Sequence, residues 1–215
     1  MTRPFVVFDL DGTLIDGYAA IAEALGYALK RLHRPPLPAR EVRAMVGHGL
    51  ERLLEDAVGP ALAAEGVRLF RERYPEVAIT GTSLMPGVTE VLADLDQRGH
   101  AMAVASNKPA RYSRIILDAK GVGRYFREIG GPDAETPPKP DPTMLRRLMA
   151  GAGATPAGTV VVGDMEIDAA MARAAGCDVL LVPRGSRTRE ELLAMGEDGL
   201  LEDLADLPAR LEGWS

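Results

Sequence analysis

The chain has 215 residues, and its 25 Lys and Arg against 31 Asp and Glu give a formal net charge of −6. Its hydrophobic share of 47% and charged share of 26% are ordinary for a folded protein and exclude a disordered or collagen-like chain. An acidic chain offers no general basic face to nucleic acid or to an anionic membrane, so we expect neither partner. A small anionic substrate remains compatible with this charge, because it needs only local positive charge.

Cysteine usage and apolar run lengths indicate the compartment. The single cysteine, Cys177, cannot form a disulfide within the chain, which is typical of a reducing compartment, so we expect a cytoplasmic protein. The longest apolar stretches, such as residues 179–182, are as long as a strand and far shorter than a membrane-spanning helix. The sequence leaves both a monomer and a homodimer open.

Short apolar runs alternate with amphipathic stretches along most of the chain. The runs cover residues 5–8, 101–105, 159–162 and 179–182, with a weaker one at 128–130, and helical patterns cover 87–98, 110–120, 142–150 and 164–175. Continuous apolar strands that alternate with helices predict a parallel sheet that is covered on both faces. With right-handed crossovers, the result is an α/β fold with a doubly wound parallel sheet.

Residues 17–80 interrupt this alternation, because they contain no convincing strand. Their helical patterns cover residues 19–32, 41–45, 50–58 and 61–74. A whole strand–helix–strand unit takes about 30 residues, so this region is too long for one crossover. We therefore predict an all-helical cap subdomain at 17–80, inserted into a core made of 1–16 and 81–215. The alternative is a long helical excursion within one domain.

Two carboxylates follow the first predicted strand directly, in the run from Asp9 to Thr13 that also holds Asp11. In an open parallel sheet, ligands bind at the carboxyl ends of the strands. These two acids are therefore placed where a site would be. Taken alone, Asp and Gly after a strand are explained equally well as loop residues.

Three further groups of polar residues follow later strands. Ser106 and Asn107 come after the second core strand, Lys139 lies in a proline-rich loop, and Asp164 follows the strand at 159–162. Asp168 stands four residues after Asp164, which places both carboxylates on one helix face. Each group alone could be a helix cap or a solvated charge. Together, carboxylates, a hydroxyl and one ammonium at successive strand ends predict a common site.

This set resembles the haloacid dehalogenase superfamily of phosphatases and phosphotransferases over nearly the whole chain. Asp9-x-Asp-Gly-Thr13 resembles its first motif, Ser106 its second, Lys139 its third and Gly163-Asp-x-x-x-Asp168 its fourth. Region 17–80 is similar to the cap that this family inserts. Within the family, the chain is most similar to phosphoglycolate phosphatases. Met165 departs from the pattern, since Ser or Thr is usual there.

The resemblance implies a Mg²⁺-dependent phosphomonoester hydrolase that works through an aspartyl phosphate. By resemblance, Asp9 is the nucleophile, and Asp11 protonates the leaving group and then activates water. Lys139 balances charge on the nucleophile and the phosphate. The metal ligands implied are Asp9, Asp164 and the main-chain carbonyl of Asp11, with Asp168 in a supporting role.

The substrate-binding residues implied are Thr13, Ser106 and Asn107 in the core, with His48 in the cap. His48 stands between two glycines, so its loop could approach the core closely. An ordinary surface histidine is the alternative. Arg43 could bind a substrate carboxylate, although a solvated helix face explains it too.

Three functions remain open on the sequence. The first is hydrolysis of a small phosphorylated metabolite, with 2-phosphoglycolate as the best assignment. The second is a sugar-phosphate phosphatase or phosphomutase of the same superfamily. The third is a phospho-accepting module similar to a response-regulator receiver, which the inserted cap and Asp11 disfavour, because Asp11 equips the site to hydrolyse its own intermediate.

Overall fold

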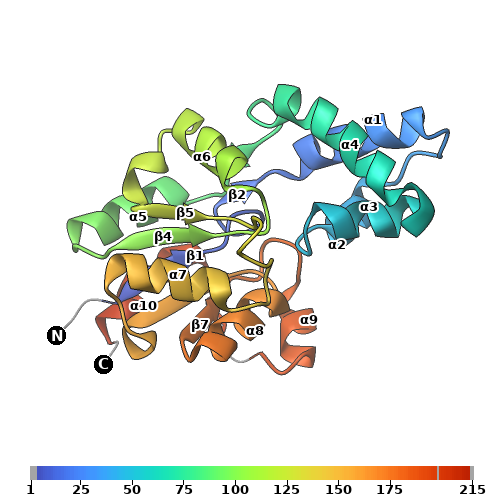
Figure 1. Ribbon diagram of the computed structural model, residues 1–215. Coiled ribbons are helices and arrows are strands. Elements are labelled where there is room, and N and C mark those ends of the chain that lie inside the picture. Colours follow the sequence, from blue (N-terminus) through green and yellow to red (C-terminus); the bar gives the residue numbers. More distant parts are fainter. Residues whose placement is uncertain (1–3, 198, 214–215) are drawn as a thin grey trace.

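A five-stranded parallel sheet forms the centre of the protein (Figure 1). The computed structural model describes residues 4–197 and 199–213. The strands are β1 (Phe5–Phe8), β4 (Met102–Ala105), β5 (Glu128–Gly130), β6 (Thr159–Gly163) and β7 (Asp178–Leu181). Their order across the sheet is β5-β4-β1-β6-β7, and all four neighbouring pairs are parallel. The predicted α/β class and parallel sheet are confirmed.

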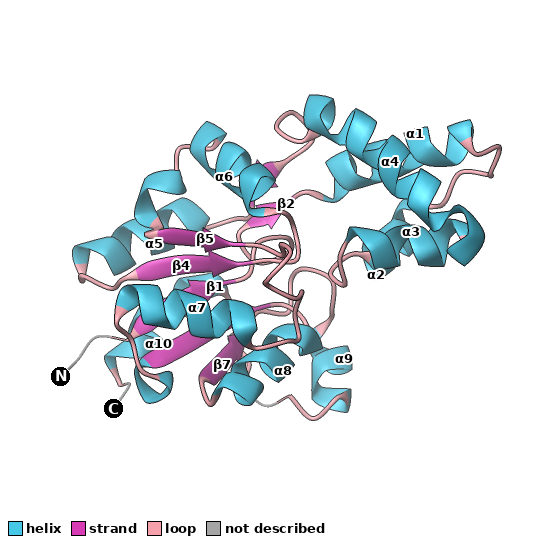
Figure 2. Ribbon diagram, in the orientation of Figure 1, coloured by secondary structure: helices cyan, strands magenta, loops and turns pink. Residues whose placement is uncertain are grey.

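The side chains of β1 alternate between two buried clusters, one on each face of the sheet. Val6 and Phe8 pack with residues of helices α5, α6 and α10, whereas Phe5 and Val7 pack with residues of α7 and α8 (Figure 2). These helices are α5 (Val88–Gln97), α6 (Ala110–Ala119), α7 (Thr143–Ala152), α8 (Glu166–Ala175) and α10 (Leu207–Glu212). A strand that is covered on both faces has to be apolar throughout, which explains the unbroken run that the sequence shows.

Shorter elements complete the core. Helix α9 (Arg189–Ala194) follows β7, and three 3₁₀ turns lie at η1 (Gly123–Tyr125), η2 (Pro156–Gly158) and η3 (Leu204–Asp206). Thr188 caps α9, because its hydroxyl accepts from the Glu191 amide while the Glu191 carboxylate accepts from the Thr188 amide. The start of α9 is therefore stabilised by hydrogen bonds within its own first turn.

Four helices lie between the first strand and the rest of the core. They are α1 (Tyr18–Arg31), α2 (Ala39–Met45), α3 (Leu50–Val58) and α4 (Pro60–Val77), and we call residues 18–77 the helical segment. The segment lies beyond the carboxyl ends of the central strands (Figure 1). Two short antiparallel strands, β2 (Ile15–Asp16) and β3 (Ser83–Leu84), bring its two connections side by side. The sequence could not predict these strands, because a strand of two residues is too short to show an alternating pattern of apolar and polar residues.

The helical segment buries its own apolar side chains. Helix α4 packs along both α1 and α3, and Leu25, Leu54 and Leu69 are almost fully buried. Helix α4 also runs past the predicted end at residue 74, through Pro75. A proline interrupts one hydrogen bond of a helix, but Pro75 is exposed, so water can serve the freed carbonyl.

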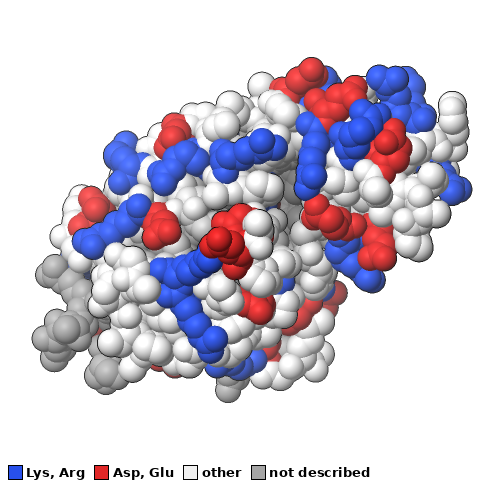
Figure 3. All heavy atoms as spheres, viewed as in Figure 1, with Lys and Arg blue, Asp and Glu red and all other residues white. Residues whose placement is uncertain are grey.

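Charged side chains of both signs are mixed over the face of the molecule in Figure 3. Opposite charges pair along the helical segment, for example Arg68 with Glu65 and Glu72. The face shown therefore presents no extended basic surface. Among the helices of the described residues, none is long and apolar enough to cross a membrane.

Candidate active site

The loop after β1 begins the site at the carboxyl ends of the central strands. Its first residue, Asp9, is still tied to β6, because its amide donates to the Val162 oxygen at 2.8 Å. The chain then turns tightly through Gly12, which has φ +92°. A Cβ on Gly12 would lie 2.5 Å from Oδ2 of Asp164, so only a glycine lets this loop and Asp164 approach each other.

Three buried carboxylates meet at this point. Asp9, Asp164 and Asp168 each offer an oxygen atom, and these three atoms lie within 4.8 Å of one another. The ammonium of Lys139 lies 2.5 Å from Oδ1 of Asp9 and 2.7 Å from Oδ1 of Asp168. Lys139 is itself only 4% exposed. One ammonium therefore contacts two of the three carboxylates, and all four residues are buried.

The carboxylate of Asp164 has no cationic partner among the described contacts. It accepts from the Ser186 amide at 2.5 Å and, more weakly, from the Thr13 hydroxyl at 3.4 Å. Burial raises the pKa of Asp164 well above its ordinary range, and the charges of Asp9 and Asp168 raise it further. Burial also raises the pKa of Asp9 to about 6, although Lys139 opposes the shift. The cluster carries more negative charge than its surroundings neutralise.

This donor set fits a divalent cation. Carboxylate oxygens are hard ligands of the kind that Mg²⁺, Ca²⁺ and Mn²⁺ accept. A bound cation would supply the missing positive charge beside Asp164 and Asp9. Asp168 is already engaged on both oxygens, because Oδ2 accepts from the Asp164 and Met165 amides and Oδ1 accepts from Lys139. Asp164 accepts only from neutral donors, and Asp9 contacts Lys139 through Oδ1 alone, so these two side chains suit a cation better than Asp168 does.

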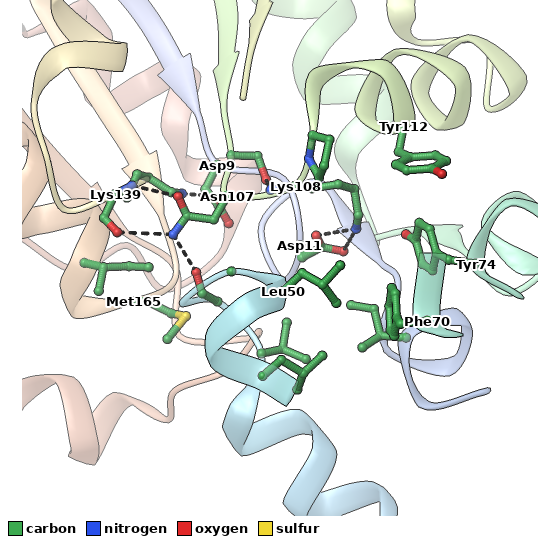
Figure 4. Close-up of a pocket in the computed structure, with 18 of the residues that line it drawn as sticks. Asp9, Asp11, Leu50, Phe70, Tyr74, Asn107, Lys108, Tyr112, Lys139 and Met165 are labelled. Atoms are coloured by element: carbon green, nitrogen blue, oxygen red, sulfur yellow. Dashed lines mark hydrogen bonds and ion pairs between the residues drawn. The ribbon is translucent and has the colours of Figure 1, made fainter. Parts of the chain in front are cut away.

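Asp11 lies apart from this cluster and pairs with Lys108. The ammonium of Lys108 lies 2.6 Å from Oδ1 of Asp11, and both side chains are almost buried. Burial alone lowers the pKa of Lys108, but the attraction of Asp11 outweighs it, and the net pKa is above its ordinary value. Figure 4 shows this pair beside Asp9, on the side toward Tyr74. Lys108 directly follows Asn107 in the sequence, but no sequence pattern predicts its pairing with Asp11.

Asn107 links three segments of the chain. Its side-chain amide donates to the Gly47 oxygen at 2.8 Å and to the Lys139 oxygen at 3.2 Å, and its own oxygen accepts from the Lys139 amide at 2.7 Å. The neighbouring Ser106 is buried, and its hydroxyl accepts from the Lys108 amide at 3.2 Å. The loop after β4 therefore fixes both the lysine loop and one point of the helical segment.

A pocket of about 90 Å³ lies between the core and the helical segment. The core contributes polar groups to its lining, including Asp9, Asp11, Ser106 and Lys139. The helical segment contributes mostly apolar and aromatic side chains, and Figure 4 shows several of them facing the polar groups. Those that line the pocket include Val46, Leu50, Leu53, Phe70 and Tyr74. The pocket is therefore polar on one side and apolar on the other.

Four residues expected in the site from the sequence do not line this pocket, and one of them, Asp164, lies in the buried carboxylate cluster. Thr13 is fully buried and bonds to Asp164 instead. His48 stands outside, with Nε2 3.9 Å from Oε1 of Glu166, while its neighbour Gly47 does line the pocket. Arg43 donates to the Gly185 oxygen at 3.2 Å. The two glycines beside His48 suggested that this residue approaches the core. In the structure, the main chain of this loop approaches the core and the imidazole does not.

Met165, the departure from the family pattern, lines the pocket and is 2% exposed. It packs against Gly47, where a Cβ would lie 2.3 Å from the Met165 sulfur. Its amide still donates to Asp168 at 3.1 Å, so the start of α8 keeps its cap. Met165 therefore supplies an apolar contact to the helical segment. No sequence pattern predicts this contact.

Comparison with known proteins agrees with this geometry. Residues 6–182 match the family of haloacid dehalogenase-like hydrolases. A phosphoglycolate phosphatase of Pseudomonas putida is 36% identical over 211 residues, which cover 94% of this chain and 77% of that protein. A phosphoglycolate phosphatase of Caulobacter vibrioides is 35% identical over 210 residues, which cover 94% of this chain and 88% of that protein.

A solved structure shares the fold. The crystal structure of a predicted phosphoglycolate phosphatase from Haemophilus somnus superposes with a TM-score of 0.88 and 27% identity, covering 98% of each chain. The sequence match, the fold and the buried carboxylate cluster agree with one another. The chain therefore belongs to the haloacid dehalogenase-like hydrolases, and its relatives place it among the phosphatases of that family.

Proposed function

We propose that this protein is a Mg²⁺-dependent phosphomonoester hydrolase whose substrate is 2-phosphoglycolate. The observation that carries the proposal is that Asp9 and Asp11 line one pocket, while only Asp9 belongs to the buried carboxylate cluster. Two acids in different environments can take different roles in one reaction. The relatives named as phosphoglycolate phosphatases support the choice of substrate.

In the first step, a carboxylate oxygen of Asp9 attacks phosphorus, and the bond between phosphorus and the ester oxygen breaks. Lys139 holds Oδ1 of Asp9 at 2.5 Å, which leaves Oδ2 as the attacking atom. Asp11 gives a proton to the departing alkoxide, which leaves as the free hydroxyl compound. The product of this step is a phosphoryl group on Asp9.

In the second step, water attacks the phosphorus of this aspartyl phosphate. Asp11, now ionised, accepts a proton from the water, the bond from Asp9 to phosphorus breaks, and inorganic phosphate leaves. The Ser106 hydroxyl would donate to a phosphoryl oxygen, and Lys139 would offset the negative charge of the phosphoryl group. Both side-chain N–H groups of Asn107 already donate to main-chain oxygens, so Asn107 would donate to the phosphoryl group through its main-chain amide. Both acids then return to their starting protonation states.

The cation would be held by Asp9 and Asp164, together with the main-chain oxygen of Asp11. When bound, Mg²⁺ supplies positive charge that offsets the repulsion between the phosphate and the carboxylates. Asp168 positions this set, because it holds Lys139 and the start of α8 at the same time. Mg²⁺ is our choice among hard divalent ions because it combines carboxylates with substrate phosphate and retained water.

We further propose that residues 17–80 act as a cap subdomain on a core of residues 1–16 and 81–215. The apolar wall of the pocket comes from this segment, and the antiparallel pair β2–β3 lies at its base. A cap that closes over the core would exclude water during phosphoryl transfer. The lone and buried Cys177 supports a cytoplasmic location, and both a monomer and a homodimer remain compatible with it.

A phosphate-release assay over a panel of phosphorylated metabolites tests this function. With Mg²⁺, kcat/KM should be highest for 2-phosphoglycolate, and EDTA should abolish turnover. Sugar phosphates belong in the panel, since a higher kcat/KM for one of them would replace the assigned substrate. Full turnover by metal-free protein would contradict the proposed role of the carboxylate cluster.

A further inference from the structure

The pocket is lined by three cationic side chains among the described residues, and they are placed differently. Lys139 is held between Asp9 and Asp168, in the part of the pocket assigned to the phosphoryl group. Arg71 is half exposed and paired with Glu51 at 2.7 Å. Lys108 is 7% exposed at its side chain, and it pairs with the Asp11 carboxylate. Lys108 is therefore the buried cation outside the phosphoryl position.

Lys108 lies where the leaving group of the substrate would bind. In the proposed reaction, Asp11 protonates the ester oxygen, so the atoms beyond that oxygen lie past Asp11, away from Asp9. Figure 4 shows Lys108 and Tyr74 on that side of the pocket. The ammonium of Lys108 lies 5.7 Å from the centre of the Tyr74 ring. A group carried next to the ester would meet this lysine and this tyrosine.

Tyr74 provides a second and independent observation. Tyr74 is 3% exposed, and its hydroxyl is buried without a hydrogen-bond partner among the residues that the structure describes. A buried hydroxyl without a partner costs free energy, unless a ligand supplies one. Around it, Phe70 and Leu50 offer no polar atoms. The Tyr74 hydroxyl can donate to an acceptor, and the nearby Lys108 ammonium lacks a counter-ion whenever Asp11 carries the proton of the first step, so the site then suits an anion.

We propose that Lys108, with Tyr74, determines specificity by binding a carboxylate that the substrate carries next to its phosphate ester. The Lys108 ammonium pairs with this carboxylate, and the Tyr74 hydroxyl donates to it. A neutral leaving group of the same size offers the Lys108 ammonium no negative charge to pair with. This inference rests on the proposed function, and it goes further by assigning the residues that recognise the non-reacting end of the substrate.

The test uses two esters that differ only at that end, 2-phosphoglycolate and 2-hydroxyethyl phosphate. The readout is the ratio of their kcat/KM values, because damage to the shared catalytic groups lowers both values and cancels in the ratio. Wild type should favour the carboxylate by tenfold or more. Lys108→Met should lower this ratio at least tenfold, and Tyr74→Phe by about threefold. Lys108→Arg keeps the charge and should retain part of the preference.

Lys30→Met is the matched control, since Lys30 is exposed on α1 and does not line the pocket. It should leave the ratio unchanged. A ratio that is also unchanged in Lys108→Met and Tyr74→Phe would overturn the proposal. If Lys108→Met does not fold, as judged by circular dichroism, Tyr74→Phe decides alone, since it removes a single unpaired hydroxyl.

A second pair separates this proposal from the choice of substrate. 3-Phosphoglycerate carries a carboxylate one carbon farther from the ester, and glycerol 3-phosphate is its neutral counterpart. If wild type prefers 3-phosphoglycerate in this pair and Lys108→Met removes the preference, the role of Lys108 stands even where 2-phosphoglycolate fails as the substrate. A wild type that prefers the carboxylate in neither pair contradicts the role of Lys108.

Discussion

The side-chain amide of Asn107 donates to the main-chain oxygen of Gly47 at 2.8 Å, and this bond joins the loop after β4 to the loop before α3. The oxygen of the same side chain accepts from the Lys139 amide at 2.7 Å. One residue of the core thus holds the helical segment against the site and positions the lysine loop. The position of the helical segment relative to the core therefore depends in part on the Asn107 side chain.

Asn107→Ala should therefore impair catalysis more than stability. We expect kcat/KM for 2-phosphoglycolate to fall by about tenfold or more, while the free energy of unfolding falls by about 1–2 kcal/mol. His48→Ala is the comparison variant, because His48 stands outside the pocket, and we expect it to stay within about twofold of wild type. Steady-state kinetics and urea denaturation measure both quantities. A loss in His48→Ala as large as in Asn107→Ala would restore the role that the sequence suggested for His48.

Asp164→Asn should stabilise the metal-free protein while it abolishes activity. Burial raises the pKa of Asp164, and it raises that of Asp9 from 3.8 to about 6, so the folded state binds protons more tightly than the unfolded state. The metal-free protein therefore loses stability as pH rises from about 4 to about 6 and Asp9 ionises, and it loses more as Asp164 ionises. Removing one charge should recover about 1–3 kcal/mol at pH 8.

Thermal unfolding at pH 8, with EDTA or with Mg²⁺, measures this effect. Wild type should gain Tm when Mg²⁺ is added, and Asp164→Asn should not, since it has lost a ligand. The difference between the two proteins in EDTA should shrink at pH 5. A variant that melts lower than wild type in EDTA at pH 8 would show that the Asp164 carboxylate is well compensated without metal.

Asp11→Asn should affect different leaving groups unequally. General acid catalysis contributes about 10²–10⁴-fold, so turnover of 2-phosphoglycolate should fall by at least about 100-fold. p-Nitrophenolate barely needs a proton to leave, so the first step with p-nitrophenyl phosphate should suffer much less. A stopped-flow trace should then show a burst of p-nitrophenolate followed by slow turnover. Absence of a burst, with equal losses on both substrates, would remove Asp11 from the role of general acid.

Cys177 should be inert in the folded protein. Burial raises the pKa of its thiol to about 11, and the neighbouring Asp178 adds to the shift. Only about one thiol in a thousand is then ionised at pH 8, and the thiolate is the reactive form. Reaction with Ellman's reagent at pH 8 should be slow until guanidinium unfolds the chain. Complete labelling of folded protein within minutes would contradict this environment.

The strands and the polar motifs were predictable for one physical reason. A strand covered on both faces must be apolar, so β1 and β6 stand out as apolar runs, and the residues after them are fixed at the carboxyl edge of the sheet. The sequence therefore predicts that Asp9, Ser106 and Asp164 lie at one edge of the sheet. The order of the strands depends on long-range pairing and has no local signal.

The apolar half of the pocket could not be predicted in the same way. Tyr74 and Leu50 lie on helices, and the helical spacing of apolar residues indicates that such side chains are buried. It does not indicate whether they pack against the core or line a ligand pocket. Likewise, the pair of Lys108 with Asp11 joins residues that are 97 positions apart. The glycines around His48 did predict a close approach, but the structure assigns that approach to the Gly47 main chain.

The most direct test of the account is to locate the phosphoryl group during turnover. Asp11→Asn retains the nucleophile but hydrolyses its intermediate slowly, so the protein should accumulate in the phosphorylated form when mixed with p-nitrophenyl phosphate and Mg²⁺. Acid quenching within the burst, followed by digestion and mass spectrometry, should find one phosphoryl group on the peptide that contains Asp9, and none in Asp9→Asn/Asp11→Asn. A phosphoryl group on another residue, or none at any time during the burst, would contradict nucleophilic catalysis by Asp9.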